Sequence, residues 1–115
     1  MNKNEDAQER ILELLTKNKV IDGVISADNA SGVISINVAL SLGYKVPEDV
    51  SVIGFSSKSI SSHSVPKLSI IRQQAKEIGA SATQLLIQRL QNKVDEDDFS
   101  TRIIKTDFIQ AGSSN

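Results

Sequence analysis

Hydrophobic residues along the chain follow two patterns, helical spacing and short continuous runs. Helical spacing predicts three helices, over residues 4–17, 31–42 and 74–92. Apolar runs predict four strands, over residues 20–27, 50–55, 68–71 and 102–110. Alternation of this kind is typical of an α/β fold in which helices cover a largely parallel sheet. We therefore predict a parallel-sheet, three-layer α/β sandwich that ends in a short irregular tail, residues 112–115.

The predicted helix over residues 31–42 carries no charge, because no Lys, Arg, Asp or Glu occurs between Asp28 and Lys45. Such a helix has no ordinary solvated face. One apolar side is expected to pack on the sheet, and the second has no evident partner in so short a chain. A subunit interface would explain this second side, and enclosure within a larger domain would explain it equally well. Gly43 is expected to end the helix.

Polar residues follow two of the predicted strands. Open parallel sheets bind ligands beyond the carboxyl ends of their strands. This position is occupied by four candidate ligand-binding residues, Asp28, Asn29, Ser56 and Ser57. Carboxylate, amide and hydroxyl groups can all form hydrogen bonds with a ligand. The alternative is that Asp28 only caps the following helix and that the serines form a polar turn.

Composition excludes several classes of function for this stretch of chain. Its 115 residues include 13 basic and 14 acidic ones, for a net charge of -1, without the clustered Lys and Arg of a nucleic-acid-binding face. The absence of cysteine excludes disulfides and thiolate chemistry. No apolar run approaches the roughly 20 residues of a membrane span, and no signal peptide opens the chain. We therefore expect a cytoplasmic protein.

No motif indicates catalysis or metal binding. His63 has no carboxylate or second imidazole at ligand spacing, so we interpret it as a residue of a surface loop. The acidic run at residues 95–98 lacks the glycine and the alternating spacing of a calcium loop and is interpreted as a solvated linker. We expect no enzyme activity, no cofactor and no metal site.

Six segments of the chain together match a known family in order and spacing. The most specific is Gly43-Tyr44-Lys45-Val46-Pro47-Glu48-Asp49-Val50-Ser51-Val52-Ile53-Gly54-Phe55. The others are Ser26-Ala27-Asp28-Asn29, Pro66-Lys67-Leu68-Ser69-Ile70-Ile71-Arg72-Gln73, Ile78-Gly79-Ala80, Leu85-Leu86 and Thr106-Asp107-Phe108-Ile109-Gln110-Ala111-Gly112-Ser113. From about residue 7 to residue 114, the chain resembles the C-terminal region of LacI/GalR-type transcriptional regulators.

This resemblance implies a ligand-responsive regulator. Such proteins have an N-terminal helix-turn-helix domain and a two-lobed core like that of a periplasmic sugar-binding protein. A small effector, usually a sugar or a nucleobase, binds between the lobes. This chain would be the last third of such a protein, a partial type I periplasmic-binding-protein-like core. The implied partners are the effector, a second copy in a homodimer, and operator DNA bound through a domain absent from this chain, with no membrane partner.

The resemblance also implies an arrangement of lobes and an interface. Residues 1–65 and 101–115 would belong to the C-terminal lobe, and residues 66–92 to the N-terminal lobe. The uncharged helix and a loop beside it would form the dimer interface, whose residues would be Val33, Ile34, Ile36, Asn37 and Ser64.

The chain departs from the family's usual pattern at three positions. Members usually have Asn-Asp where this chain has Asp28-Asn29, often have Asp in place of Ser56, and commonly have Arg in place of Ala111. A serine hydroxyl forms weaker hydrogen bonds with a ligand than a charged carboxylate does. The serine at position 56 therefore indicates a change of ligand.

Two other classes of protein share features with this chain. One is a sugar-binding transport protein of the same fold, of which this would be the C-terminal part. An upstream signal peptide would favour transport, and an upstream helix-turn-helix would favour regulation. The other is an α/β enzyme such as a phosphoryl-transfer receiver domain, which needs an acidic cluster that Asp28 alone does not supply.

Overall fold

The computed structural model describes residues 3–56, 64–93, 95, 97 and 99–115. Residues 57–63, which include Ser57 and His63, lie outside the described residues. The chain divides into two compact units. Unit 1 contains the described residues up to Arg72 and from Asp107 onward, and unit 2 contains those between them.

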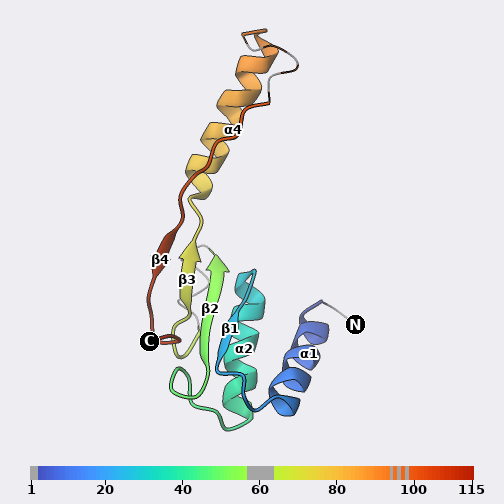
Figure 1. Cartoon of the computed structure of the whole chain (residues 1–115), viewed down its shortest axis with the longest axis vertical. Helices are drawn as coiled ribbons and strands as arrows, with labels where there is room; N and C mark the ends of the chain where they lie inside the picture. Colours follow the sequence, from blue (N-terminus) through green and yellow to red (C-terminus); the bar gives the residue numbers. More distant parts are fainter. Residues whose placement is uncertain (1–2, 57–63, 94, 96, 98) are drawn as a thin grey trace. The chain divides into compact units, whose positions relative to one another are not determined.

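Unit 1 is built on a four-stranded sheet in the order β1-β2-β3-β4 (Figure 1). Its strands are β1 Gly23–Ile25, β2 Ser51–Ser56, β3 Ser69–Arg72 and β4 Asp107–Ile109. The first three strands are parallel, and β4 runs antiparallel to β3. The prediction of an α/β fold with a largely parallel sheet is confirmed.

Two helices of unit 1 lie side by side (Figure 1). Helix α2, Asn29–Ser41, packs on β1 and β2, and helix α1, Lys3–Lys17, packs on α2. Leu15 of α1 is buried, and Ile11 packs against the same core. Part of the second apolar side of α2 therefore has a partner within the chain, contrary to the expectation from the sequence.

Leu68 fills the space between α2 and the sheet. A Cβ atom on Gly32 of α2 would lie 2.8 Å from Leu68 Cδ2, and one on Gly54 of β2 would lie 2.6 Å from the same atom. The two glycines thus leave room for a leucine side chain that is 1% exposed. The buried apolar core consists of Leu15, Ile36, Val38, Ala39, Val46, Val50, Val52, Leu68 and Ile70.

Helix α2 ends at Ser41, and the predicted glycine, Gly43, directly follows its C-cap residue Leu42. Gly43 has a φ of 85°, in the left-handed region that glycine adopts without steric cost. Its N–H donates to the Leu40 carbonyl oxygen at 3.0 Å, and the Tyr44 N–H donates to the Ala39 carbonyl oxygen at 3.0 Å. These bonds satisfy carbonyl groups that the end of the helix leaves without helical partners.

Two predicted strands are longer than the strands in the structure. The first strand is limited to β1, and Val20 before it is 90% exposed. The last strand is limited to β4, because residues 102–106 belong to unit 2. The division into units falls after Arg72, because β3 pairs with both β2 and β4.

Unit 2 consists of helix α4, Ala75–Leu90, and the segment that follows it. Arg102 Nη1 donates to Gln84 Oε1 at 2.8 Å and to Ser81 Oγ at 3.3 Å. The Arg89 guanidinium lies 5.4 Å from the centroid of the Phe99 ring. No residue of α4 is buried among the described residues, so its apolar stripe remains largely exposed.

Candidate functional site

Asp28 links the carboxyl end of β1 to the start of α2. It is the N-cap of the helix, and its Oδ1 accepts hydrogen bonds from the Ser31 N–H and the Ser31 hydroxyl, both at 2.8 Å. The Ser31 N–H, followed by the hydroxyl, holds the pKa of Asp28 below its ordinary value of 3.8. The capping role considered from the sequence is therefore present. A carboxylate has about four acceptor positions, so capping does not exhaust its capacity for a ligand.

The backbone before this cap is held by a buried serine. Ser26 is 6% exposed, its N–H donates to the Ile53 carbonyl oxygen at 2.8 Å, and its hydroxyl donates to the Asp28 carbonyl oxygen at 2.6 Å. These bonds attach the turn between β1 and α2 to the neighbouring strand β2. The position of the Asp28 backbone is consequently fixed by the sheet as well as by the helix.

Asn29 is the first residue of α2 and has an unusual environment. Its Oδ1 atom is buried and has no hydrogen-bond partner within the described part of the chain. A buried acceptor without a partner is uncommon and calls for an explanation, and a ligand donor would satisfy it.

Asp28 and Asn29 line the same cavity, which has a volume of about 420 Å³. The rest of its lining comes from the first turns of α1 and α2, through Lys3, Asn4, Ala7, Ala30, Ser31 and Ile34. The site thus combines carboxylate and amide acceptors with the ammonium group of Lys3 as a donor. This combination can bind a small molecule that carries several hydroxyl or amide groups.

A second group of polar residues lies at the carboxyl ends of β2 and β3. Ser56 is the last residue of β2 and is the register partner of Arg72 on β3, which in turn is the register partner of Asp107 on β4. Arg72 Nη2 donates to Asp107 Oδ2 at 2.7 Å. The sequence pattern indicates Ser56 but not Arg72 or Asp107, since pairing between residues so distant in sequence leaves no local signal.

The structure brings only some of the predicted ligand-binding residues together. Asp28 and Asn29 share one cavity. Ser56 lies at the same end of the sheet, but Ile25 pairs with Ile53, so Ser56 lies three residues further along β2 than the end of β1, about 10 Å. Ser57 lies outside the described residues.

The residues predicted to form a dimer interface have different environments. Val33 and Ile34 are half-buried on α2, and Asn37 is exposed. Ile36 is 0% exposed within unit 1, so this prediction was wrong: its side chain forms part of the core. Ser64 is also buried, and its Oγ accepts a hydrogen bond from the Leu68 N–H at 2.9 Å.

An exposed flank of α2 nevertheless remains. Its side chains are uncharged, and none of them reaches the sheet core; they are Ala30, Asn37, Leu40 and Ser41. Half-buried Val33 lies at helical spacing with Ala30, Asn37 and Leu40 and completes this flank. We call these five residues the α2 flank.

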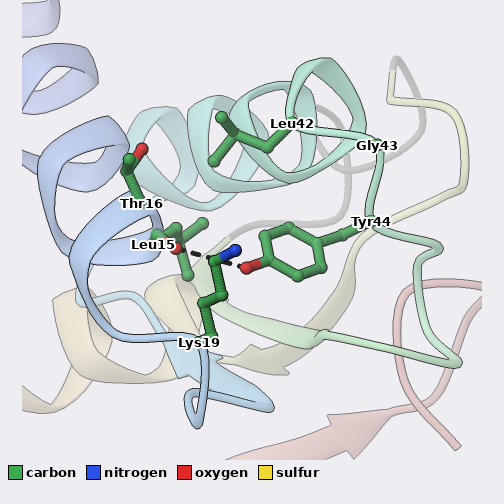
Figure 2. Close-up of a pocket in the computed structure, with 6 residues that line it drawn as sticks. All are labelled: Leu15, Thr16, Lys19, Leu42, Gly43 and Tyr44. Atoms are coloured by element: carbon green, nitrogen blue, oxygen red, sulfur yellow. Dashed lines mark hydrogen bonds between the residues drawn. The ribbon is translucent and has the colours of Figure 1, made fainter.

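A separate pocket lies at the other end of α2 (Figure 2). It is lined by Leu15, Thr16, Lys19, Leu42, Gly43 and Tyr44 and has a volume of about 380 Å³. Figure 2 shows the Tyr44 hydroxyl pointing toward α1, where it donates to the Leu15 carbonyl oxygen at 3.3 Å. Because it lies where α1 and α2 end, this pocket is distinct from the cavity beside Asp28.

The described residues contain neither a metal-binding cluster nor a membrane-spanning helix. No group of three or more His, Cys, Asp or Glu side chains there could hold a metal ion. His63, Glu96 and Asp98 lie outside that part of the chain. No helix in the described ranges is long and apolar enough to span a bilayer.

Comparison with known proteins identifies a family and several relatives. The family of periplasmic binding protein-like domains matches residues 2–114. The HTH-type transcriptional regulator CelR of Thermobifida fusca is 29% identical over 84 residues, which cover 73% of this chain and 25% of CelR. The ribose operon repressor of Bacillus subtilis (strain 168) is 35% identical over 83 residues, which cover 72% of this chain and 26% of the repressor.

Solved structures show the same fold. A LacI family transcriptional regulator from Arthrobacter sp. FB24, in complex with lactose, matches with a TM-score of 0.85 and 25% identity, over 97% of this chain and 41% of that chain. The expected resemblance to LacI/GalR-type regulators is therefore confirmed. This chain spans about a quarter of the length of the curated relatives that it matches.

Proposed function

The chain belongs to the family of periplasmic binding protein-like domains, and on this premise we propose that it forms part of the effector-sensing and dimerisation region of a LacI/GalR-like transcriptional regulator. Its role would be to bind a small effector and to transmit that binding through a change of conformation. The relatives are named as regulators and repressors, which favours regulation over transport or catalysis.

The observation that carries this proposal is the placement of Asp28 and Asn29. Both follow the carboxyl end of β1, both line one cavity, and Asn29 contributes a buried acceptor that the described residues leave unsatisfied. A ligand with several hydroxyl groups can donate to the Asp28 carboxylate and to Asn29 Oδ1. We propose a sugar or a nucleobase as the ligand, with Ser56 and Ser57 as further contacts at the neighbouring strand.

In the intact regulator this ligand would lie between two lobes. Residues up to 65 and from 101 onward would belong to the C-terminal lobe, and residues 66–92, which include α4, would belong to the N-terminal lobe. Ile78, Leu86 and Leu90 on α4 are 44%, 57% and 73% exposed. These exposed apolar side chains support the proposal that the intact regulator contains further elements of the fold that cover them. Side chains of this kind normally pack against a sheet or another helix.

The far face of the unit 1 sheet supports the same interpretation. Side chains alternate along strands, so Phe55, Ile71 and Phe108, which are register partners, lie on one face with Ile25. Phe108 is 54% exposed and Ile25 is 76% exposed. Sheets with parallel strands usually have both faces covered.

The proposed partners follow from the same role. A second copy of the chain would bind through the α2 flank to form a homodimer. Operator DNA would be bound by a domain outside this chain, and such a regulator would act in the cytoplasm. The effector would shift the equilibrium between two arrangements of the lobes by binding one of them more tightly.

Titration calorimetry tests the proposal with ribose, lactose, cellobiose, adenine and guanine as probes. We expect no measurable binding by the isolated chain, because only part of the ligand site is present. A longer polypeptide that supplies the rest of both lobes is expected to bind at least one probe. Sub-micromolar binding by the isolated chain would contradict a ligand site shared between two lobes.

Variants of the longer polypeptide test the assigned residues. Asp28→Ala is expected to weaken binding about tenfold or more, as the loss of a charge-assisted hydrogen bond does. Asp22→Ala is the matched control, because Asp22 precedes β1 at the opposite end of the same strand. Equal affinities for both variants would remove Asp28 from the site.

A further inference from the structure

Both connections between the two units leave unit 1 at one pair of residues. Unit 1 ends at Arg72 on β3 and resumes at Asp107 on β4. These two residues are register partners in the antiparallel β3–β4 pair. Any bending between the units must therefore occur beyond this pair, in the residues that follow Arg72 and precede Asp107.

The same two residues form an ion pair. Arg72 Nη2 donates to Asp107 Oδ2 at 2.7 Å, and the side chains are 38% and 50% exposed. Arg72 Nε is buried and has no hydrogen-bond partner among the described residues. A guanidinium group can bind a carboxylate through two parallel hydrogen bonds. Here Arg72 Nη2 forms a hydrogen bond with Asp107, whereas Arg72 Nε forms none with the described residues.

The pair is also the last rung of a short ladder. β3 and β4 share only three register pairs, Ile70–Ile109, Ile71–Phe108 and Arg72–Asp107. The ends of such ladders open most readily. Opposite charges that face each other across two strands oppose this opening. Arg72 and Asp107 thus form the end of the β3–β4 ladder, and the two connections between the units begin directly beyond them.

We propose that Arg72 is a positioning residue, whose ion pair with Asp107 holds the two connections together and restricts the orientations that unit 2 samples relative to unit 1. Loss of the pair opens the last rung and lengthens both connections. The range of orientations then increases. This role does not depend on the proposed ligand, and its test contains none, so the two proposals can fail independently.

A purely local role in the stability of unit 1 is the competing explanation. Because both side chains are substantially exposed, the pair is expected to contribute little to stability. A local role predicts a small change in the unfolding temperature of unit 1 and no change in the distances between units. A positioning role predicts a change in those distances even where the unfolding temperature is preserved.

Spin labels measure these distances directly. The chain has no cysteine, so Glu48→Cys in unit 1 and Gln91→Cys in unit 2, both at exposed positions, introduce two labels without background. Pulsed electron paramagnetic resonance, on labelled chain diluted with unlabelled chain, then gives the distribution of distances between them. Arg72→Gln is expected to broaden this distribution. Exchange of the charges, by Arg72→Asp together with Asp107→Arg, is expected to restore much of the original width.

The matched control removes a different exposed ion pair from the same unit. Arg10→Gln eliminates the contact between Arg10 Nη1 and Glu13 Oε2, 3.7 Å apart on α1, and is expected to leave the distribution unchanged. An unchanged width in Arg72→Gln, or equal broadening in Arg10→Gln, would overturn the proposal. If Arg72→Gln lowers the unfolding temperature of unit 1, the isosteric variant Asp107→Asn decides by the same criteria.

Discussion

Ser113 forms two hydrogen bonds with Val52, one through its carbonyl group and one through its hydroxyl group. The Val52 N–H donates to the Ser113 carbonyl oxygen at 2.8 Å, and the Ser113 hydroxyl donates to the Val52 carbonyl oxygen. The same hydroxyl accepts from the Ser69 N–H at 2.7 Å. Direct pairing of β2 with β3 begins only at Ile53 and Ser69, so Ser113 joins the two strands just before their own ladder starts.

Replacement of Ser113 by alanine should therefore destabilise unit 1. The variant leaves the buried Ser69 N–H without its acceptor, and a buried unsatisfied group of this kind costs about 1–3 kcal/mol. Urea unfolding measures the change in the free energy of unfolding. Thr16→Ala at an exposed position of α1 is the control, and surface changes of this type usually stay within about 0.5 kcal/mol. Equal values for both variants would show that the Ser113 hydroxyl is not structurally important.

Local patterns in the sequence predict the elements of unit 1 but not this contact. Helix α2 and its end at Gly43 follow from apolar spacing and from a residue that favours positive φ, both of which are properties of neighbouring residues. Ser113 lies in a polar segment that is expected to trail off, yet it is buried. Its partner Val52 is 61 residues away, and no periodicity reports such a distance.

The candidate site shows the same distinction. Asp28, Asn29 and Ser56 directly follow apolar runs, so a general rule about parallel sheets is sufficient to select them. Arg72 and Asp107 become partners only through the register of β3 and β4. The burial of Ile36 was not predicted either, because an uncharged helix leaves the sequence without a marker for the side that faces the sheet.

Leu68 and Gly54 provide a test of packing between the sheet and α2. A Cβ atom on Gly54 would lie 2.6 Å from Leu68 Cδ2, so Gly54→Ala overfills the core, at a cost of about 1–3 kcal/mol. Leu68→Ala creates a cavity, at a cost of about 2–5 kcal/mol. In the double variant the new methyl group occupies part of that cavity. We expect its loss of stability to be smaller than the sum of the two single losses.

Chemical denaturation of the three variants provides the measurement. Gly23→Ala is the matched control, because Gly23 is also a strand glycine and a Cβ atom there would meet nothing within 4 Å. It should change stability little. Strict additivity of Gly54→Ala and Leu68→Ala would contradict the direct contact between these positions.

Asp28 predicts a dependence of stability on pH. Hydrogen bonds from Ser31 lower the pKa of Asp28 below 3.8 in the folded chain. The stability that this carboxylate contributes is therefore fully present above the unfolded-state pKa and is lost as the pH falls through the lower folded-state pKa. Thermal unfolding between pH 6 and pH 2 should show this loss in the wild type.

Two substitutions separate capping from titration at this position. Asp28→Ser keeps a capping side chain without a titrating group, so its stability near neutral pH should be close to that of the wild type, with a weaker loss in acid. Asp28→Ala removes the cap as well and should cost about 0.5–2 kcal/mol at neutral pH. An acid response in Asp28→Ser equal to that of the wild type would assign the pH dependence to other carboxylates.

The α2 flank predicts self-association of the isolated chain. Its exposed residues include no charge, and an aspartate placed there would have to be desolvated at an interface, which is costly without a partner. Val33→Asp should therefore give a monomer by multi-angle light scattering where the wild type gives a dimer.

Because Val33 also packs against the core, Leu40→Asp, at a position 42% exposed, repeats the test with less risk to the fold. Leu12→Asp, at a position 41% exposed on α1, is the matched control and should remain dimeric. A wild-type chain that is monomeric, or dimers that persist in both Val33→Asp and Leu40→Asp, would exclude the α2 flank as the interface.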